Sequence, residues 1–133
     1  MVNTGCSSSG VALHLACESL RHGETDLMLA GGVYAAMDQE GLVSLCHAGM
    51  LSASGRCSPF DAAADGTLLA EAVGMVVLKR LDDALRDQDP IYGVIQASGL
   101  NQDGASNGIT APSGAAQERL IKSVYDKFHI DQS

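Results

Sequence analysis

The sequence predicts an α/β protein, and three observations support this class. Segments with helical periodicity alternate along the chain with short apolar runs of strand length. The chain has 133 residues, of which 46% are apolar, which is enough for one domain with a buried core. Its fifteen glycines and low aromatic content suit tight connections between closely packed elements.

The first predicted helix spans residues 6–22, because apolar residues recur there at helical spacings. Gly23 follows as a residue that ends the helix. The run LMLA at 27–30 is continuously apolar, and it predicts a strand buried on both faces of a parallel or mixed sheet.

The later segments continue this alternation of helices and strands. In chain order we predict a helix at 39–47, a long surface loop at 52–66, a strand at 73–81, a helix at 82–88, a strand at 91–100 and a loop at 101–114. The last predicted helix, 115–130, is amphipathic. One of its faces carries Leu120, Ile121, Val124 and Phe128.

Charge and cysteine usage exclude several classes of function. Sixteen acidic and eight basic residues give a net charge of −8 without any basic run, which argues against nucleic acids and anionic membranes as partners. No apolar run is long enough to span a bilayer. The four cysteines form no CxxC pair and no secretory segment precedes them, so we expect a cytoplasmic protein without a disulfide framework, bound metal or tightly bound cofactor.

The stretch GCSSSG around Cys6 raises the question of a nucleophile. A phosphate-binding loop would need Lys and Ser or Thr where Val11 and Ala12 stand, and a hydrolase elbow would need Gly at Ser9. A cysteine in the first turn of a helix would be favoured as a thiolate by unpaired N–H groups, with the serines capping that helix. From local chemistry alone, a small buried cysteine next to serines that merely cap the helix is favoured over a nucleophile.

The other reactive side chains favour structural roles. We expect Cys17 to pack in the core, and Cys46 and Cys57 to be inert because no second pair completes a metal site. Asp61 and Asp65 lie in a turn-rich stretch, where carboxylates usually cap and turn the chain.

The four histidines also favour structural roles. His14 lies eight residues beyond Cys6, about 12 Å along one helix, so it is expected to be a partly buried helix residue. His22 and His129 are expected at the ends of helices. His47 directly follows Cys46 and has none of the neighbours of a catalytic histidine.

Several collinear blocks resemble the β-ketoacyl synthase (ketosynthase) domains of modular type I polyketide synthases. NTGCSSSGVALHLACESLRHGETDLMLAGGV resembles their active-site region, which reads T-A-C-S-S-S before the same helix. The resemblance continues through AGMLSASGRCSPFDAAADG and VGMVVLKRLDDALRDQDPIYGVI. The block NQDGASNGITAPSGAAQ points to the polyketide type rather than a stand-alone fatty acid enzyme.

The resemblance implies a thiolase-like fold of five αβαβα layers built from two similar halves. Residues 1–60 would be the end of the first half, with the nucleophile, and residues 61–133 the start of the second. The segment 26–33 would be the edge strand that pairs across a homodimer. The chain would thus be an internal piece of the domain.

The resemblance also implies an acyltransferase reaction, a decarboxylative Claisen condensation. Cys6 would carry the acyl chain as a thioester, and its backbone N–H would help form the oxyanion hole. A malonyl-type extender on an acyl carrier protein would supply the attacking carbanion. Thr110 would lie near the phosphopantetheine arm of that carrier protein.

Two features separate this chain from a complete active site. The family uses two histidines, in H-G-T-G-T and G-H motifs, and neither motif is present, so the chain alone is expected not to condense. Four positions depart from the family pattern, with glycine in place of Ala and Leu or alanine in place of glycine. They are Gly5, Gly10, Ala70 and Ala72.

Three other functions stay open at this point. The chain could be a non-condensing acyl-binding or docking module, a fatty acid synthase-type condensing enzyme, or an acyltransferase that uses Cys6 alone. The identity of the acyl chain and extender, and the position in an assembly line, are not encoded in any recognisable motif.

Overall fold

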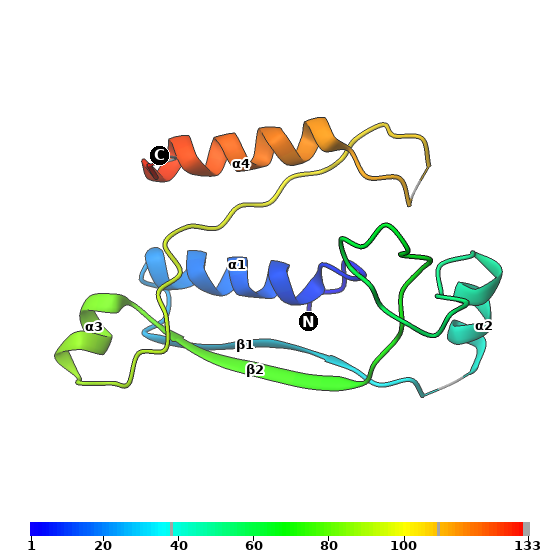
Figure 1. Cartoon of the computed structure of the whole chain (residues 1–133). Coiled ribbons are helices and arrows are strands. Elements are labelled where there is room, and N and C mark those ends of the chain that lie inside the picture. The colour runs from blue at the N-terminus through cyan, green and yellow to red at the C-terminus, as the bar shows by residue number, and fades with distance from the viewer. Residues whose placement is uncertain (38, 109, 132–133) are drawn as a thin grey trace. The chain divides into compact units, whose positions relative to one another are not determined.

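The computed structural model describes residues 1–37, 39–108 and 110–131 (Figure 1). The elements in chain order are α1 (Ser8–Arg21), β1 (Leu27–Tyr34), α2 (Gln39–His47), β2 (Ala72–Lys79), α3 (Leu81–Arg86) and α4 (Gly114–Phe128). They form two compact units, one of residues 1–31 with 75–133 and one of residues 32–74. Residue 109 of the predicted 101–114 loop, and residues 132–133 at the end of the predicted second half, lie outside the described residues.

Helix α1 supplies the centre of the small core in the first unit. Ala16, Cys17 and Leu20 are its buried residues, which confirms the predicted core position of Cys17. The helix ends at Arg21, one residue before its predicted end, and Gly23 follows the C-cap residue as predicted. The Gly23 N–H donates to the Leu20 carbonyl, and the Glu24 N–H donates to the Ser19 carbonyl. These two bonds satisfy carbonyls that would otherwise be left unpaired at the end of the helix.

Strands β1 and β2 form a two-stranded sheet, and within the first unit they run in opposite directions (Figure 1). The predicted parallel or mixed sheet is therefore wrong for the described residues. The chain returns from β1 to β2 at the same end of the sheet, which makes the pair antiparallel. Both strands differ from their predicted bounds, since β1 continues to Tyr34 and β2 spans Ala72–Lys79 rather than 73–81.

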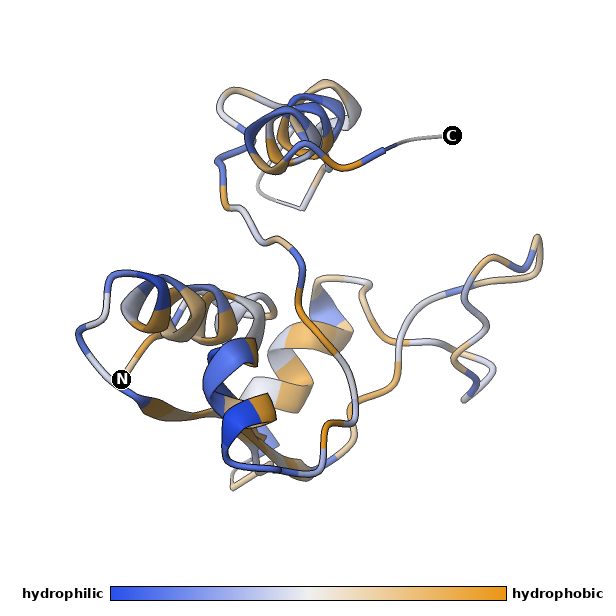
Figure 2. Cartoon of the chain, turned by 90° about the vertical axis from the view of Figure 1, so that its left-hand side faces the viewer, coloured by the Kyte–Doolittle hydropathy of each residue, from blue (hydrophilic) through white to orange (hydrophobic). Residues whose placement is uncertain are grey.

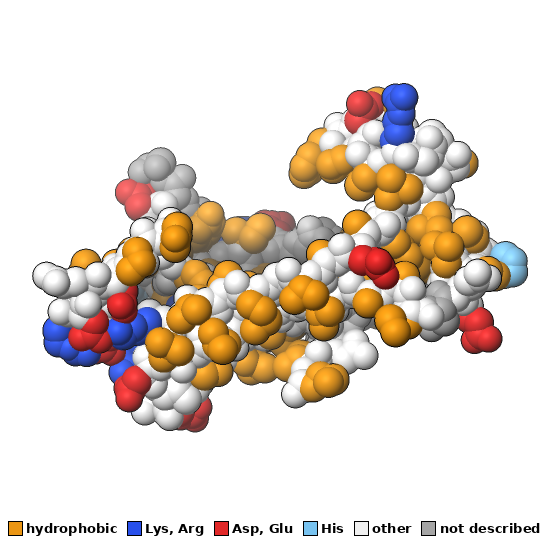
Figure 3. Space-filling view, turned by 90° about the horizontal axis from the view of Figure 1, so that it is seen from below, with side chains coloured by type: hydrophobic (Ala, Val, Ile, Leu, Met, Phe, Trp, Pro, Cys, Tyr) orange, Lys and Arg blue, Asp and Glu red, His pale blue; other side chains and the backbone are white. Residues whose placement is uncertain are grey.

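Burial of the sheet on both faces is also wrong. Only Ala30 of β1 is buried, and no residue of β2 is. The apolar residues at every second position, Leu27, Leu29, Met75 and Val77, are 53%, 63%, 59% and 63% exposed. Figure 3 shows apolar side chains gathered along this outer face of the strands. Residues alternate across a strand, so α1 covers one face and leaves the other open.

The predicted strand at 91–100 is not a strand. These residues are extended but lack a ladder partner among the described residues, since the sheet consists of β1 and β2. Within this segment Gly99 lies against Val124 and Leu120 of α4. Its large apolar side chains are exposed, namely Ile91, Tyr92, Val94, Ile95 and Leu100. An apolar run of this length does not by itself establish a strand.

Helix α4 is amphipathic, and its apolar residues gather on one side (Figure 2). It begins at Gly114 and ends at Phe128, within one or two residues of the predicted bounds. Leu120, Val124 and Phe128 are partly buried as expected, whereas Ile121 is 55% exposed. The Phe128 ring lies 4.8 Å from the Arg21 guanidinium carbon, so the ends of α1 and α4 are in contact.

Arg80, directly before α3, joins three elements of the first unit. Its guanidinium donates to the carbonyls of Leu20 and Thr25 at 3.1 and 2.7 Å. It also binds the carboxylates of Asp26 and Asp83. The planar guanidinium carries several donors in a fixed arrangement, so it links the end of α1, the start of β1 and the start of α3.

The second unit contains α2 and the predicted long loop at 52–66. The loop is closed at its base by the Ser52 N–H donating to the Thr67 carbonyl and the Thr67 N–H donating to the Met50 carbonyl, both at 2.9 Å. Gly66 has φ +149, and a Cβ there would lie 2.5 Å from the Ser52 nitrogen. Only glycine fits this close backbone approach.

None of the helices within the described ranges is long and apolar enough to cross a membrane.

The close approach of Gly99 to α4 gives a stability prediction. A Cβ at Gly99 would lie 2.5 Å from Val124 Cγ2, so Gly99→Ala is expected to lower the free energy of unfolding by about 1–3 kcal/mol through overpacking. Gly93→Ala in the same extended segment is the matched control, because a Cβ there meets nothing within 4 Å. Urea denaturation measures both, and equal midpoints for the two variants would contradict the packing.

Candidate active site

Cys6 lies in a tight turn that directly precedes α1. The turn is held by hydroxyl groups, with the Ser8 Oγ donating to the Gly5 carbonyl at 2.7 Å and accepting from the Thr4 N–H at 2.9 Å. The Ser7 Oγ donates to the Thr4 carbonyl at 3.0 Å. Cys6 itself is exposed and is not part of a disulfide. The turn therefore presents the thiol to solvent next to the helix start.

Two details of the predicted Cys6 environment are wrong. The helix begins at Ser8 rather than at residue 6, so Cys6 precedes the N-cap residue Ser7 and is not in the first helical turn. The serines do not cap α1, because the Ser7 side chain makes no capping hydrogen bond and both hydroxyls bond back to the turn. Serine hydroxyls often prefer such local backbone acceptors.

The glycine at position 5 fits this turn. Gly5 has φ +68, in the left-handed region where an alanine would be strained. Gly10 faces open space, because a Cβ there would meet nothing within 4 Å. Ala70 and Ala72 are not among the described non-glycine residues with positive φ, so replacing the family's glycine with alanine does not strain the backbone at either position.

Thr110, the second candidate residue, lies on a loop whose two ends are attached to the same residue. The Asn101 Nδ2 donates to the Ala116 carbonyl at 2.7 Å, and the Ser113 Oγ accepts from the Ala116 N–H at 3.3 Å. Ala116 is fully buried in the first turn of α4. The base of the 101–113 loop is thus fixed on the helix, while Thr110 is exposed.

Among the described residues, no hydrogen bond or ion pair joins Thr110 to Cys6. Both lie in the first unit, Cys6 before α1 and Thr110 before α4. The structure therefore shows each candidate residue on its own exposed turn and shows no direct contact between them.

His14, His22 and His129 lie as the sequence predicts. His14 is partly buried on α1, and its Nδ1 lies 2.9 Å from the Ser98 Oγ. His22 and His129 are the C-cap residues of α1 and α4. Cys46 and Cys57 are exposed. Within the described ranges, no three His, Cys, Asp or Glu side chains are grouped to hold a metal ion.

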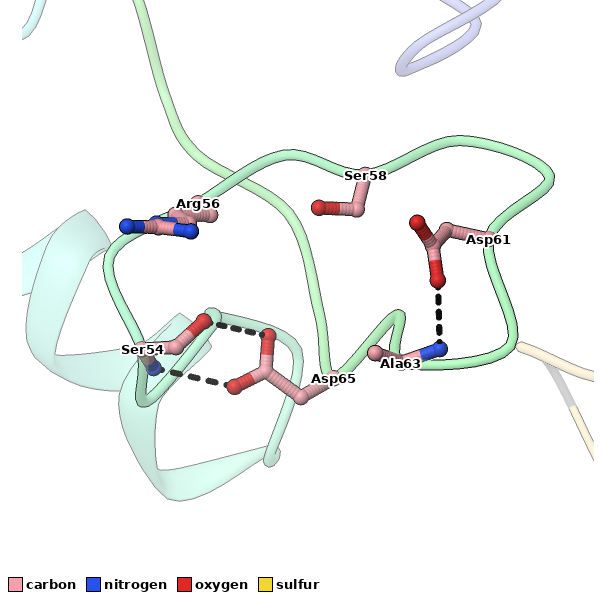
Figure 4. A pocket seen from close by; sticks show the side chains of 6 residues that line it. All are labelled: Ser54, Arg56, Ser58, Asp61, Ala63 and Asp65. Carbon is pink, nitrogen blue, oxygen red and sulfur yellow. Dashed lines mark hydrogen bonds between the residues drawn. The ribbon is translucent and has the colours of Figure 1, made fainter.

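A polar pocket lies in the 52–66 loop (Figure 4). It is lined by Ser54, Arg56, Ser58, Asp61, Ala63 and Asp65. Asp61 accepts from the Ala63 N–H at 2.8 Å, which confirms its expected turn role. Asp65 accepts from the Ser52 hydroxyl, the Ser54 N–H and the Ser54 hydroxyl. Both carboxylates therefore organise the loop rather than form an acid–base pair.

The sequence interpretation missed two contacts near the candidate site. The bond between His14 and Ser98 joins residues 84 positions apart, and no local pattern signals such a pair. The attachment of Asn101 to Ala116 was also missed. A signal for it existed, because an asparagine at the border between an apolar segment and a turn-rich loop often bonds to backbone groups.

The chain belongs to the β-ketoacyl synthase family. Residues 1–84 match the model of the β-ketoacyl synthase N-terminal domain, and residues 92–133 match the model of the C-terminal domain. The expected family is thereby confirmed.

Polyketide synthases are among the curated relatives. A phenolphthiocerol/phthiocerol polyketide synthase of Mycobacterium tuberculosis is 57% identical over 120 residues, which cover 90% of this chain and 8% of that protein. Polyketide synthase PksL of Bacillus subtilis is 48% identical over 129 residues, covering 97% of this chain and 3% of that protein. The chain thus spans less than a tenth of the length of these relatives.

Solved ketosynthase structures confirm the thiolase-like fold class. The ketosynthase from module 6 of the bacillaene synthase of Bacillus subtilis 168 superimposes with a TM-score of 0.94 at 48% identity, covering 97% of this chain and 23% of that chain. The oxazolomycin ketosynthase domain OzmH KS7 of Streptomyces albus JA3453 gives a TM-score of 0.93 at 36% identity, covering 98% and 23%. The chain has the fold of the corresponding part of a ketosynthase domain.

The hydrogen bonds of Asp65 give a pH prediction. The Ser52 hydroxyl, followed by the Ser54 N–H, lowers the pKa of the Asp65 carboxyl. Because the folded pKa is below the unfolded value of about 3.9, the bonds stabilise the loop above that pH and are lost as the pH falls through the folded pKa.

Ser52→Ala is therefore expected to raise the pKa of Asp65 toward its ordinary value, as measured by carboxyl NMR titration. Ser58→Ala is the control, because Ser58 lines the same pocket without bonding to Asp65. An unchanged Asp65 titration in Ser52→Ala would contradict the assigned cause.

Proposed function

We propose that this chain is the nucleophile-bearing segment of a polyketide ketosynthase that carries out decarboxylative Claisen condensation. The observation that carries the proposal is the match of 97% of the chain to the bacillaene module 6 ketosynthase at a TM-score of 0.94, together with an exposed Cys6 directly before α1. The polyketide synthase relatives favour the polyketide type over the fatty acid synthase type.

Cys6 is the acyl-carrying nucleophile in this proposal. Its thiolate attacks the acyl thioester carbonyl, a new carbon–sulfur bond forms, and the phosphopantetheine thiol of the acyl carrier protein leaves. A malonyl-type thioester then loses carbon dioxide, and its carbanion attacks the Cys6 thioester. The new carbon–carbon bond releases Cys6 as a thiolate. The Cys6 N–H, next to the positive end of α1, would stabilise the oxyanion in both attacks.

Thr110 is the proposed contact for the phosphopantetheine arm. Its loop is fixed at the base by Asn101 and Ser113 on Ala116, which limits the positions that an exposed Thr110 takes. A threonine hydroxyl both donates and accepts, so it suits the amide groups of the arm. The arm belongs to the carrier protein, and we propose no tightly bound cofactor for the chain itself.

The same proposal covers the two halves of the domain, its oligomeric state and its missing histidines. We infer a first half ending near residue 60 and a second half beginning near residue 61, in a cytoplasmic homodimer. The edge of β1 that does not face β2 has no strand partner among the described residues, which leaves it available for pairing across a two-fold axis. The histidines that the family uses for decarboxylation are not among the four of this chain, so the isolated chain is proposed not to condense.

The test replaces the aligned segment of the bacillaene module 6 ketosynthase with this chain, so that the recipient enzyme supplies the rest of the domain. An acyl thioester is expected to add one acyl mass at Cys6, detected by intact and peptide mass spectrometry. Cys6→Ala is expected to abolish the addition, because the sulfur forms the bond that is measured. Cys46→Ala and Cys57→Ala are matched controls at exposed cysteines.

Further measurements on the chimera and on the isolated chain distinguish the competing functions. The chimeric domain is expected to release carbon dioxide from malonyl carrier protein and form a condensed product, whereas the isolated chain releases none above background. Acylation without condensation in the chimera would favour an acyltransferase that uses Cys6 alone. A chimera that acquires no acyl group at Cys6 would favour a docking module and overturn the proposal.

A further inference from the structure

The hydrogen bond between His14 and Ser98 joins the two parts of the chain that match different family models. His14 lies in the middle of α1, within residues 1–84, and Ser98 lies in the extended segment within residues 92–133. The Nδ1 and Oγ atoms are 2.9 Å apart and partly buried. A partly buried hydrogen bond that joins distant segments fixes their relative position more firmly than an exposed one.

Ser98 belongs to a short stretch that also contacts α4. We call residues 98–101 the strap. Gly99 of the strap packs against Val124 and Leu120. Asn101 donates to the Ala116 carbonyl. The strap thus holds α1 on one side and α4 on the other, and it leads directly into the loop that carries Thr110.

The position of His14 along α1 determines what its bond controls. Two other contacts of α1 lie at its C-terminal end, where Arg80 binds the Leu20 carbonyl and Arg21 lies over Phe128. A straight helix that tilts about Leu20 moves its N-terminal end most. By the rise per residue, the Cys6 turn would move roughly twice as far as His14 does. The bond to Ser98 lies between this pivot and Cys6, so it restricts the tilt.

We propose that His14 is a positioning residue for the condensation. Its bond to Ser98 fixes α1 against the strap, and this sets the Cys6 turn relative to the 101–113 loop. The proposal rests on the proposed function of Cys6 and Thr110. It predicts that loss of the bond slows acyl transfer from a pantetheine-like thioester to Cys6 without changing the intrinsic reactivity of the thiol.

The test uses the chimeric ketosynthase domain with the hexanoyl thioester of N-acetylcysteamine as the acyl donor. His14→Phe and Ser98→Ala are each expected to lower the kcat of Cys6 acylation about fivefold with KM unchanged, the size expected for one lost hydrogen bond. The double variant is expected to be no slower than either single variant, because both remove the same bond. His14→Asn keeps a hydrogen-bonding atom near the Nδ1 position, so it is expected to restore most of the rate.

Two cysteines distinguish positioning from loss of structure. Iodoacetamide needs no contact with the 101–113 loop, so its rate at the exposed Cys6 is expected to be unchanged in His14→Phe. Cys17, buried on the same helix, reports unfolding and is expected to stay unlabelled. His22→Phe, at the exposed end of α1, is the control and is expected to acylate at the unsubstituted rate.

Three results would each overturn the positioning role of His14. They are effects that multiply in the double variant, a His14→Asn variant as slow as His14→Phe, and labelling of Cys17 that accompanies the loss of rate. Absence of acylation in the unsubstituted chimera would instead overturn the proposed function, and this proposal with it.

Discussion

The guanidinium of Arg80 is the interaction on which the first unit depends. It binds two backbone carbonyls, at Leu20 and Thr25, and two carboxylates, at Asp26 and Asp83. The end of α1, the turn into β1 and the start of α3 are therefore held by one side chain. A lysine would supply the charge but not the planar set of donors that reaches all four acceptors. Hydrogen bonds to the bound carboxylates, Asp26 first, raise the pKa of Arg80.

Such a polar link matters because the apolar core is small. The buried apolar residues among the described positions are mainly alanines, with Cys17 and Leu20 as the larger members. Several large apolar side chains of β1 and β2 lie instead on the exposed face of the sheet, namely Leu27, Leu29, Met75 and Val77. An exposed apolar face of this kind usually meets other protein. It agrees with a chain that covers 23% of the bacillaene and oxazolomycin ketosynthase chains described above.

The parts that were predictable from sequence are those set by local patterns. Periodicity sets the bounds of α2, the glycine C′ residue Gly23 sets the end of α1, and turn residues set the closed loop at 52–66. All three signals act over a few positions. The direction of the sheet and the failure of 91–100 to form a strand depend on which segments meet in space, and an apolar run does not encode its partner. Within the candidate site, the position of Cys6 near a helix start was predictable, whereas the hydroxyl bonds that shift that start to Ser8 were not.

Ala116 has a consequence for how such domains diversify. Its N–H and carbonyl bind both ends of the loop that carries Thr110, and its side chain is fully buried in the first turn of α4. The residues between Asn101 and Ser113 can therefore change in length or composition while the helix beneath them keeps its place, since surface loops with a fixed base tolerate insertion at a low entropic cost. A loop fixed in this way can be exchanged as a unit between related domains, provided that Asn101, Ser113 and Ala116 are retained. Such an exchange would alter which thioesters reach the Cys6 thiol without changing the packing of α4.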